Sequence, residues 1–146
     1  MVGGINKLFC KGASGALVVG DITDLESIEN TVNWKRQVGE HVSQQKNQFE
    51  YNGQSGDEDE DDEHTIPMLL VLNKYDLVED LVNDGHDLEE FMTFDYLHKF
   101  AEEYGFIGAM CTSAKTGQGV TEAVACLVRH ILLKELQREE CLACDG

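Results

Sequence analysis

The chain has 146 residues, with 28 acidic and 11 basic side chains, and its formal net charge is −17 at pH 7. Such an acidic chain is poorly suited to nucleic-acid backbones, which bind through Lys and Arg, or to anionic membranes by charge alone. Its length and its hydrophobic content of 42% allow one domain with a core.

The first predicted strand is the apolar run at residues 16–19, and a helix is expected to follow from Leu25 to about Val42. Unbroken apolar runs are typical of strands buried on both faces of a parallel sheet. Asp24 is a suitable N-cap, because its carboxylate can accept hydrogen bonds from amides of the first helical turn. The expected inward residues of the helix are Leu25, Ile28, Val32 and Val38.

A polar segment at residues 44–64 interrupts this pattern. It is rich in Gln, Asn, Gly and Ser, and it contains seven consecutive acidic residues at 57–63. A segment with few apolar side chains and a high charge cannot bury enough surface to fold. We therefore expect a solvated, disordered acidic insertion.

The rest of the chain continues the alternation, with a strand at 68–72, a helix at 93–104, a strand at 106–111 and a last helix. Thr93 can cap the first of these helices, and Gly105 can end it in the left-handed conformation. The last helix has the clearest pattern, because apolar residues recur at three- and four-residue spacing. They are Val120, Ala123, Val124, Leu127, Val128, Ile131 and Leu132.

Strands and helices that alternate in this way predict an α/β fold, with three parallel strands and flanking helices joined by right-handed connections. Three strands are few for an open parallel sheet, and at least one edge would lack a partner. The sequence therefore predicts part of a fold rather than a whole one.

Polar clusters follow two of the predicted strands. The second strand runs into Asn73-Lys74-Tyr75-Asp76, and the third runs into Thr112-Ser113-Ala114-Lys115. Ligands of open α/β sheets lie at the carboxyl ends of the strands. We therefore expect both clusters on one rim of the sheet, close enough to share a ligand.

The donors and acceptors of these clusters suit a guanine base. A carboxylate such as Asp76 accepts two parallel hydrogen bonds, which fits guanine N1–H and the 2-amino group, whereas adenine lacks that pair of donors. Asn73 can donate to a ring nitrogen or tie the two loops together, and the Ala114 backbone N–H can donate to guanine O6. The methylene stems of Lys74 and Lys115 can lie on the two faces of the base.

Each cluster alone also fits an ordinary surface turn, because Asn and Asp favour turns. The agreement of two clusters with two predicted strand ends favours a base-binding rim over unrelated turns. A vestigial rim that no longer meets a nucleotide remains the alternative.

The two clusters resemble the NKxD and SAK guanine-specificity motifs of Ras-superfamily GTPases. Residues 9–23, FCKGASGALVVGDIT, are similar to the Rab stretch from the second helix through the fourth strand, and Trp34-Lys35 resembles a feature of the third Rab helix. The resemblance implies a partial Ras-like domain of the P-loop NTPase fold at residues 1–140, with a Cys-containing tail at 141–146. Gly20 departs from it, because Rab proteins usually have Tyr or Phe there.

The resemblance implies a base-binding set of six residues, Asn73, Lys74, Asp76, Ser113, Ala114 and Lys115. It also implies GTP or GDP as the ligand, Rab effectors or regulators as partners of a full-length form, and a role in vesicle traffic. A non-catalytic interaction fragment that binds no nucleotide is the alternative function.

The phosphate-binding motif of such proteins, G-x-x-x-x-G-K-[ST], does not occur in the sequence. The Mg²⁺ ligands that accompany it are absent too, so Mg²⁺ is expected only in a full-length form. A base site alone is expected to bind weakly, and GTP hydrolysis by this polypeptide alone is not expected. A second alternative is that the phosphate-binding half exists upstream of these residues.

Five cysteines are scattered along the chain, and no secretory signal pattern precedes them. Cys141 and Cys144 lie near the end, as prenylated cysteines do in Rab proteins, although the usual endings are adjacent cysteines or Cys-x-Cys. They are exposed thiols, lipidation sites or half of a metal site that lacks a second pair. We expect a cytoplasmic protein that reaches the cytosolic face of endomembranes only through lipidation.

Overall fold

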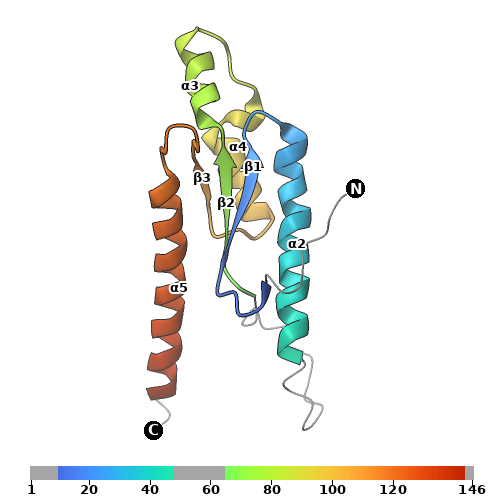
Figure 1. The fold of residues 1–146 in the computed structure, drawn as a ribbon, viewed down its shortest axis with the longest axis vertical. Helices are drawn as coiled ribbons and strands as arrows, with labels where there is room; N and C mark the ends of the chain where they lie inside the picture. Colours follow the sequence, from blue (N-terminus) through green and yellow to red (C-terminus); the bar gives the residue numbers. More distant parts are fainter. Residues whose placement is uncertain (1–9, 48–64, 144–146) are drawn as a thin grey trace.

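The computed structural model describes residues 10–47 and 65–143 (Figure 1). A parallel sheet forms its centre, with the strands β1 (Ala16–Asp21), β2 (Met68–Asn73) and β3 (Ala109–Cys111) in that spatial order. The helices are α2 (Leu25–Asn47), α3 (Tyr75–Asn83), α4 (Phe94–Glu103) and α5 (Val120–Ala143), with a 3₁₀ turn η2 (Glu90–Met92). The predicted class, three parallel strands with flanking helices, is confirmed.

Helices cover both faces of the sheet (Figure 1). Val18, Leu70 and Leu72 are buried in the larger core, which α2 and α4 complete. Leu69 and Val71 point to the opposite face and are buried together with Ala123 of α5. Alternate residues of β2 are therefore buried on both faces, as its unbroken apolar sequence predicted.

The covering by α5 is incomplete. The β1–β2 register pairs Leu17 with Leu69 and Val19 with Val71, so all four side chains share the α5 face. Leu17 is nevertheless 37% exposed and Val19 is 55% exposed. The apolar stripe of α5 is likewise half covered, because Ala123 and Leu127 are buried whereas Val124, Val128 and Leu132 are exposed.

The three predicted helix caps are confirmed. Thr93 caps α4, since its hydroxyl oxygen accepts a hydrogen bond from the Tyr96 N–H at 3.4 Å. Gly105 follows α4 with a φ of +75°, the left-handed conformation expected there. Asp24 precedes α2, and its carboxylate accepts from the Glu26 N–H at 3.1 Å.

Four expectations need correction. The third strand was expected at residues 106–111, but β3 spans only Ala109–Cys111. Leu25 was expected to face inward and is 36% exposed, whereas Ile28 is fully buried as predicted. The helix α2 continues to Asn47, into the segment predicted as insertion, because Gln and Lys are good helix formers. The helix α3, directly after β2, was not predicted.

Other predictions fall partly or wholly outside the described residues. Residues 48–64, which hold the acidic run, are not described, and neither are Cys144 and the two residues after it. The helix α5 continues through Cys141 to Ala143, past the predicted boundary of the tail. In the described ranges no helix combines the length and apolar character needed to cross a bilayer.

Gly20 lies where α2 approaches β1 closely. A Cβ atom at Gly20 would lie 3.0 Å from Cγ2 of Thr31, which is itself fully buried. The aromatic residue expected there from the Rab resemblance would therefore push α2 away from the sheet. In this chain Thr31 occupies part of the space beside Gly20.

Candidate functional site

The candidate site lies where β2 ends and α3 begins. Lys74 joins them with φ 68° and ψ 31°, and it is the one non-glycine residue with a positive φ in the ranges the structure describes. This left-handed conformation costs about 1–2 kcal/mol, so neighbouring contacts must hold it. Tyr75 N–H donates to Thr112 O at 2.9 Å, and Leu77 N–H donates to Lys74 O at 3.0 Å.

Asn73 ties the two predicted loops together. Its Oδ1 atom accepts from the Ala114 N–H at 2.9 Å and from the Thr112 hydroxyl at 3.3 Å. Of the two roles predicted for Asn73, the structure thus shows the structural one. The Ala114 amide, predicted to read a base carbonyl, is engaged with Asn73 in this structure.

Asp76 lies in the first turn of α3, with its carboxylate partly exposed at the rim. Ser113 is fully buried and donates its hydroxyl proton to Asp76 Oδ1 at 2.8 Å, while its oxygen accepts from the Thr116 N–H at 3.2 Å. Oδ2 of Asp76 accepts no hydrogen bond from the described residues. Ser113 therefore orients the carboxylate and leaves acceptor capacity for a ligand.

These side chains surround one cavity of about 280 Å³. Its lining residues are Asn73, Lys74, Asp76, Leu77, Ala114 and Lys115. The structure thus brings five of the six predicted site residues to one cavity and places the sixth, Ser113, behind Asp76. The volume is just below that of typical small-ligand pockets, about 300–1,000 Å³.

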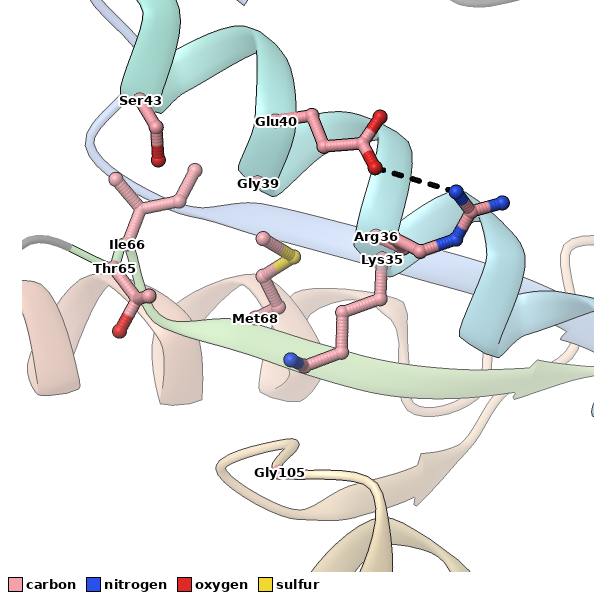
Figure 2. A pocket seen from close by; sticks show the side chains of 9 residues that line it. All are labelled: Lys35, Arg36, Gly39, Glu40, Ser43, Thr65, Ile66, Met68 and Gly105. Atoms are coloured by element: carbon pink, nitrogen blue, oxygen red, sulfur yellow. Dashed lines mark hydrogen bonds and ion pairs between the residues drawn. The ribbon is translucent and has the colours of Figure 1, made fainter. Parts of the chain in front are cut away.

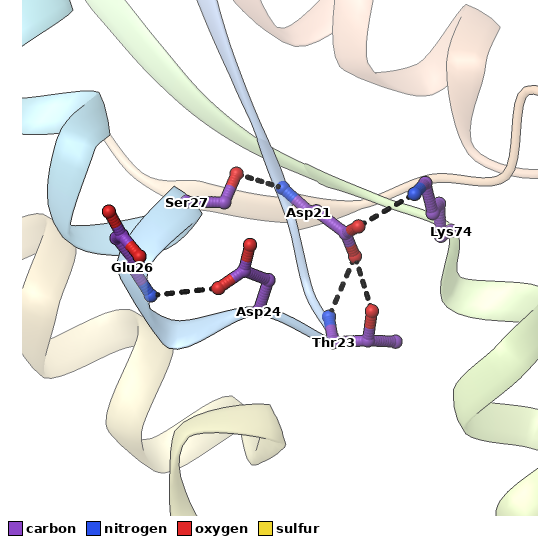
Figure 3. Close-up of polar contacts among 6 residues, drawn as sticks. All are labelled: Asp21, Thr23, Asp24, Glu26, Ser27 and Lys74. Carbon is purple, nitrogen blue, oxygen red and sulfur yellow. Dashed lines mark hydrogen bonds and ion pairs between the residues drawn. The ribbon is translucent and has the colours of Figure 1, made fainter.

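Asp21 is a further residue of the rim, and the sequence analysis did not predict it. It ends β1, opposite Asn73 in the register, and its Oδ2 atom lies 2.7 Å from the ammonium nitrogen of Lys74 (Figure 3). Its Oδ1 atom accepts from the Thr23 backbone N–H at 2.9 Å and from the Thr23 hydroxyl at 2.7 Å. The rule that predicted the other residues, polar side chains at strand ends, also applies to Asp21.

The ion pair between Asp21 and Lys74 shifts the pKa of both side chains. Burial raises the pKa of Asp21, but the hydrogen bonds from Lys74 and Thr23 together lower it by more. The pKa of Asp21 therefore lies below its ordinary value of 3.8. The hydrogen bond to Asp21 raises the pKa of Lys74 above 10.5. The pair is therefore complete at neutral pH. It is lost as the pH falls through the lowered pKa of Asp21 or rises through the raised pKa of Lys74.

A larger cavity of about 470 Å³ lies at the other end of β2, beside α2 (Figure 2). Its lining residues are Lys35, Arg36, Gly39, Glu40, Ser43, Thr65, Ile66, Met68 and Gly105. Arg36 pairs with Glu40 at 3.2 Å, whereas Lys35 extends toward Gly105. No predicted site residue lines this cavity, and it lies away from the carboxyl ends of the strands, where α/β proteins bind ligands.

The chemistry of the rim is set by its polar side chains and its two lysines. In residues 10–47 and 65–143, no group of three or more His, Cys, Asp or Glu side chains is placed to hold a metal. The lining offers hydrogen-bond acceptors, an amide and two lysine stems, which is the chemistry of a planar heterocycle.

The fold and the rim define a partial P-loop GTPase domain of the Ras-like kind. The model of the Ras family matches residues 2–133, so the chain belongs to the Ras family. Its relatives agree with the predicted Rab type. Rab-32A of Dictyostelium discoideum is 28% identical over 139 residues, which cover 94% of this chain and 52% of the relative.

Two other relatives show the same pattern. Rab-13 of Bos taurus is 32% identical over 130 residues, covering 89% of this chain and 49% of the relative. GTP-binding protein yptV2 of Volvox carteri is 28% identical over 130 residues, covering 89% and 46%. The chain thus spans about half the length of the curated relatives it matches.

Proposed function

We propose that this chain recognises the guanine base of GTP or GDP, as the base-binding part of a Rab-type small GTPase. The observation that carries this proposal is the cavity of about 280 Å³ that Asn73, Lys74, Asp76, Ala114 and Lys115 line from the ends of two adjacent strands. The relative named GTP-binding protein yptV2 supports the same ligand.

Asp76 supplies the selectivity for guanine. Its carboxylate accepts hydrogen bonds from N1–H and the 2-amino group, and the bond from Ser113 fixes the plane in which it accepts them. Adenine offers no such pair of donors. The Ala114 amide reaches guanine O6 either by sharing its proton with Asn73 or after Asn73 turns away, since it now donates to Asn73.

The chain is expected to bind the base weakly and without help from phosphates. The sequence has no P-loop motif, and its net charge of −17 repels a nucleotide's phosphates. A site with one carboxylate and two lysine stems fits a Kd on the order of 1 mM, or about 4 kcal/mol.

Titration with guanosine, GDP and adenosine tests this function. Guanosine is expected to bind the 146-residue chain at least as tightly as GDP, because phosphates meet only repulsion, and adenosine at least about tenfold more weakly. NMR line shifts suit affinities in this range. If GDP binds a thousandfold more tightly than guanosine, the chain has a phosphate site, contrary to the proposal. If adenosine binds as tightly as guanosine, the proposed specificity for guanine is wrong.

The wider activity belongs to a form that also supplies phosphate- and Mg²⁺-binding groups. For that form we propose GTP-dependent ordering of switch loops, effectors or regulators as partners, and a role in vesicle traffic. Cys141 is exposed on the last turn of α5, and lipidation there is the proposed route to the cytosolic face of endomembranes. Cys144, the other candidate, lies outside the described residues.

A second function, protein binding without nucleotide, is favoured by one observation. Leu17, Val19, Val124, Val128 and Leu132 are exposed apolar residues of β1 and α5, which we call the β1–α5 face. Among the described strands, β1 pairs only with β2, so its outer edge offers free backbone groups beside this face. An edge strand beside exposed apolar side chains is suited to a protein partner or to self-association.

Val19→Lys tests that second function. A lysine on an edge strand opposes further pairing, so the variant is expected to be monomeric at concentrations where the wild-type chain self-associates. Val82→Lys is the matched control, because Val82 lies on α3 and is also 55% exposed. Light scattering gives the mass in each case. A wild-type chain that stays at 16.3 kDa, or an equal effect of both lysines, would contradict self-association through this face.

A further inference from the structure

The carboxylate of Asp21 lies outside the base cavity but binds Lys74, whose side chain lines that cavity. Lys74 lines the cavity, and its ammonium group is bound to Asp21 at 2.7 Å, yet Asp21 is not a lining residue. We propose that Asp21 is a positioning residue of the base site, which fixes the Lys74 stem against the cavity before the base arrives. This inference rests on the proposed function, since it concerns the same site.

Asp21 is fixed by its own loop and not by Lys74. Its Oδ1 atom accepts two hydrogen bonds from Thr23, and its backbone N–H donates to the Ser27 hydroxyl at 2.9 Å (Figure 3). Only Oδ2 is left to receive the Lys74 ammonium. The position of the lysine head is thus set by β1 and the loop that follows it, independently of any ligand.

The backbone of Lys74 is fixed as well. Its left-handed conformation is held between β2 and α3, where Asn73 O accepts from the Ile22 N–H at 3.1 Å. With the Cα atom and the ammonium both held, the methylene stem between them has few conformations left. A base that packs on this stem therefore loses less rotamer entropy on binding than it would against a free lysine.

Lys115, on the other strand end, shows the contrast. It lines the same cavity and is exposed, and the described part of the chain gives it no ion pair. The Lys74 stem is therefore fixed before a base binds, whereas the Lys115 stem becomes ordered only when a base binds. Asp21, rather than a residue that touches the base, makes this difference.

A double-mutant cycle between Asp21 and Lys74 tests the proposal. In Asp21→Asn the amide oxygen keeps the two Thr23 bonds, so its NH₂ group, which can only donate, faces the ammonium and the pair is broken. We expect guanosine binding to the 146-residue chain to weaken about fivefold, the usual cost of ordering one long side chain. In Lys74→Met, which keeps a long unbranched stem without the charge, adding Asp21→Asn is expected to change the affinity less than twofold.

The outcomes separate the two claims. An unchanged affinity in Asp21→Asn, or an equal loss in the Lys74→Met background, overturns the positioning role while the proposed function stands. A wild-type chain that binds no guanosine overturns both.

If one of these variants does not fold, the proposal can still be tested on the wild-type chain. NMR relaxation of the lysine side-chain carbons is expected to show an ordered Lys74 stem and a disordered Lys115 stem without ligand. A Lys74 stem as disordered as that of Lys115 overturns the proposal.

Discussion

Replacing Asp76 with Asn is expected to weaken guanosine binding roughly 100-fold and to create binding of xanthosine. The reason is the direction of the hydrogen bonds. Asn presents one acceptor and one donor where Asp presents two acceptors, so its NH₂ group faces the guanine 2-amino group, donor against donor. Xanthine has an oxygen at that position and accepts the new bond.

The measurement is a pair of NMR titrations of the variant, one with guanosine and one with xanthosine. Asp80→Asn is the matched control, because Asp80 is an exposed carboxylate on the same helix that does not line the cavity. The control is expected to leave both affinities unchanged. If Asp76→Asn binds guanosine as well as the wild-type chain does, Asp76 does not read the base.

The second large effect concerns stability. Gly119 precedes α5 with a φ of +74°, and a Cβ atom there would lie 2.5 Å from the backbone oxygen of Cys111. That oxygen belongs to β3 and cannot turn away as a side chain would. Gly119→Ala is therefore expected to lower the free energy of unfolding by about 3 kcal/mol, from a strained backbone and a displaced α5 together.

Gly117→Ala separates these two contributions. Gly117 has a φ of +84°, but nothing lies within 4 Å of its Cβ position. Its substitution adds backbone strain without a clash and is expected to cost about 1 kcal/mol. Urea unfolding of both variants gives the difference. Equal losses in the two variants would show that the contact with Cys111 is relieved without cost.

The convergence of the predicted site residues at one rim of the sheet was predictable because a local pattern and a fold rule agree. Asn73 and Ser113 follow apolar runs that are typical of buried strands, and parallel strands bring their carboxyl ends to one edge. The caps at Thr93 and Gly105 were also predictable, because a cap depends on the residue type at the end of a helix and not on distant contacts. What was predicted correctly depended on neighbours in the sequence or on strand direction.

Two of the missed features depended on contacts between distant segments. The ion pair between Asp21 and Lys74 joins residues on different strands, and no local spacing indicates it. The stripe of α5 predicted a buried face, but its spacing gave no sign that Ala123 and Leu127 would be buried whereas Val124, Val128 and Leu132 would be exposed. The helix α3 is a different case, because its local signal was overlooked: Leu77, Val78, Leu81 and Val82 have helical spacing.

The central claim, that the rim at the ends of β2 and β3 recognises guanine, is tested most directly by mapping guanosine on the 146-residue chain. Backbone amide shifts are recorded as guanosine is added. We predict saturable shifts at Asn73 to Leu77 and at Ser113 to Thr116, and none with adenosine at the same concentration. Shifts centred on the larger cavity, at Lys35, Ser43 and Ile66, or no saturable shifts at all, would contradict it.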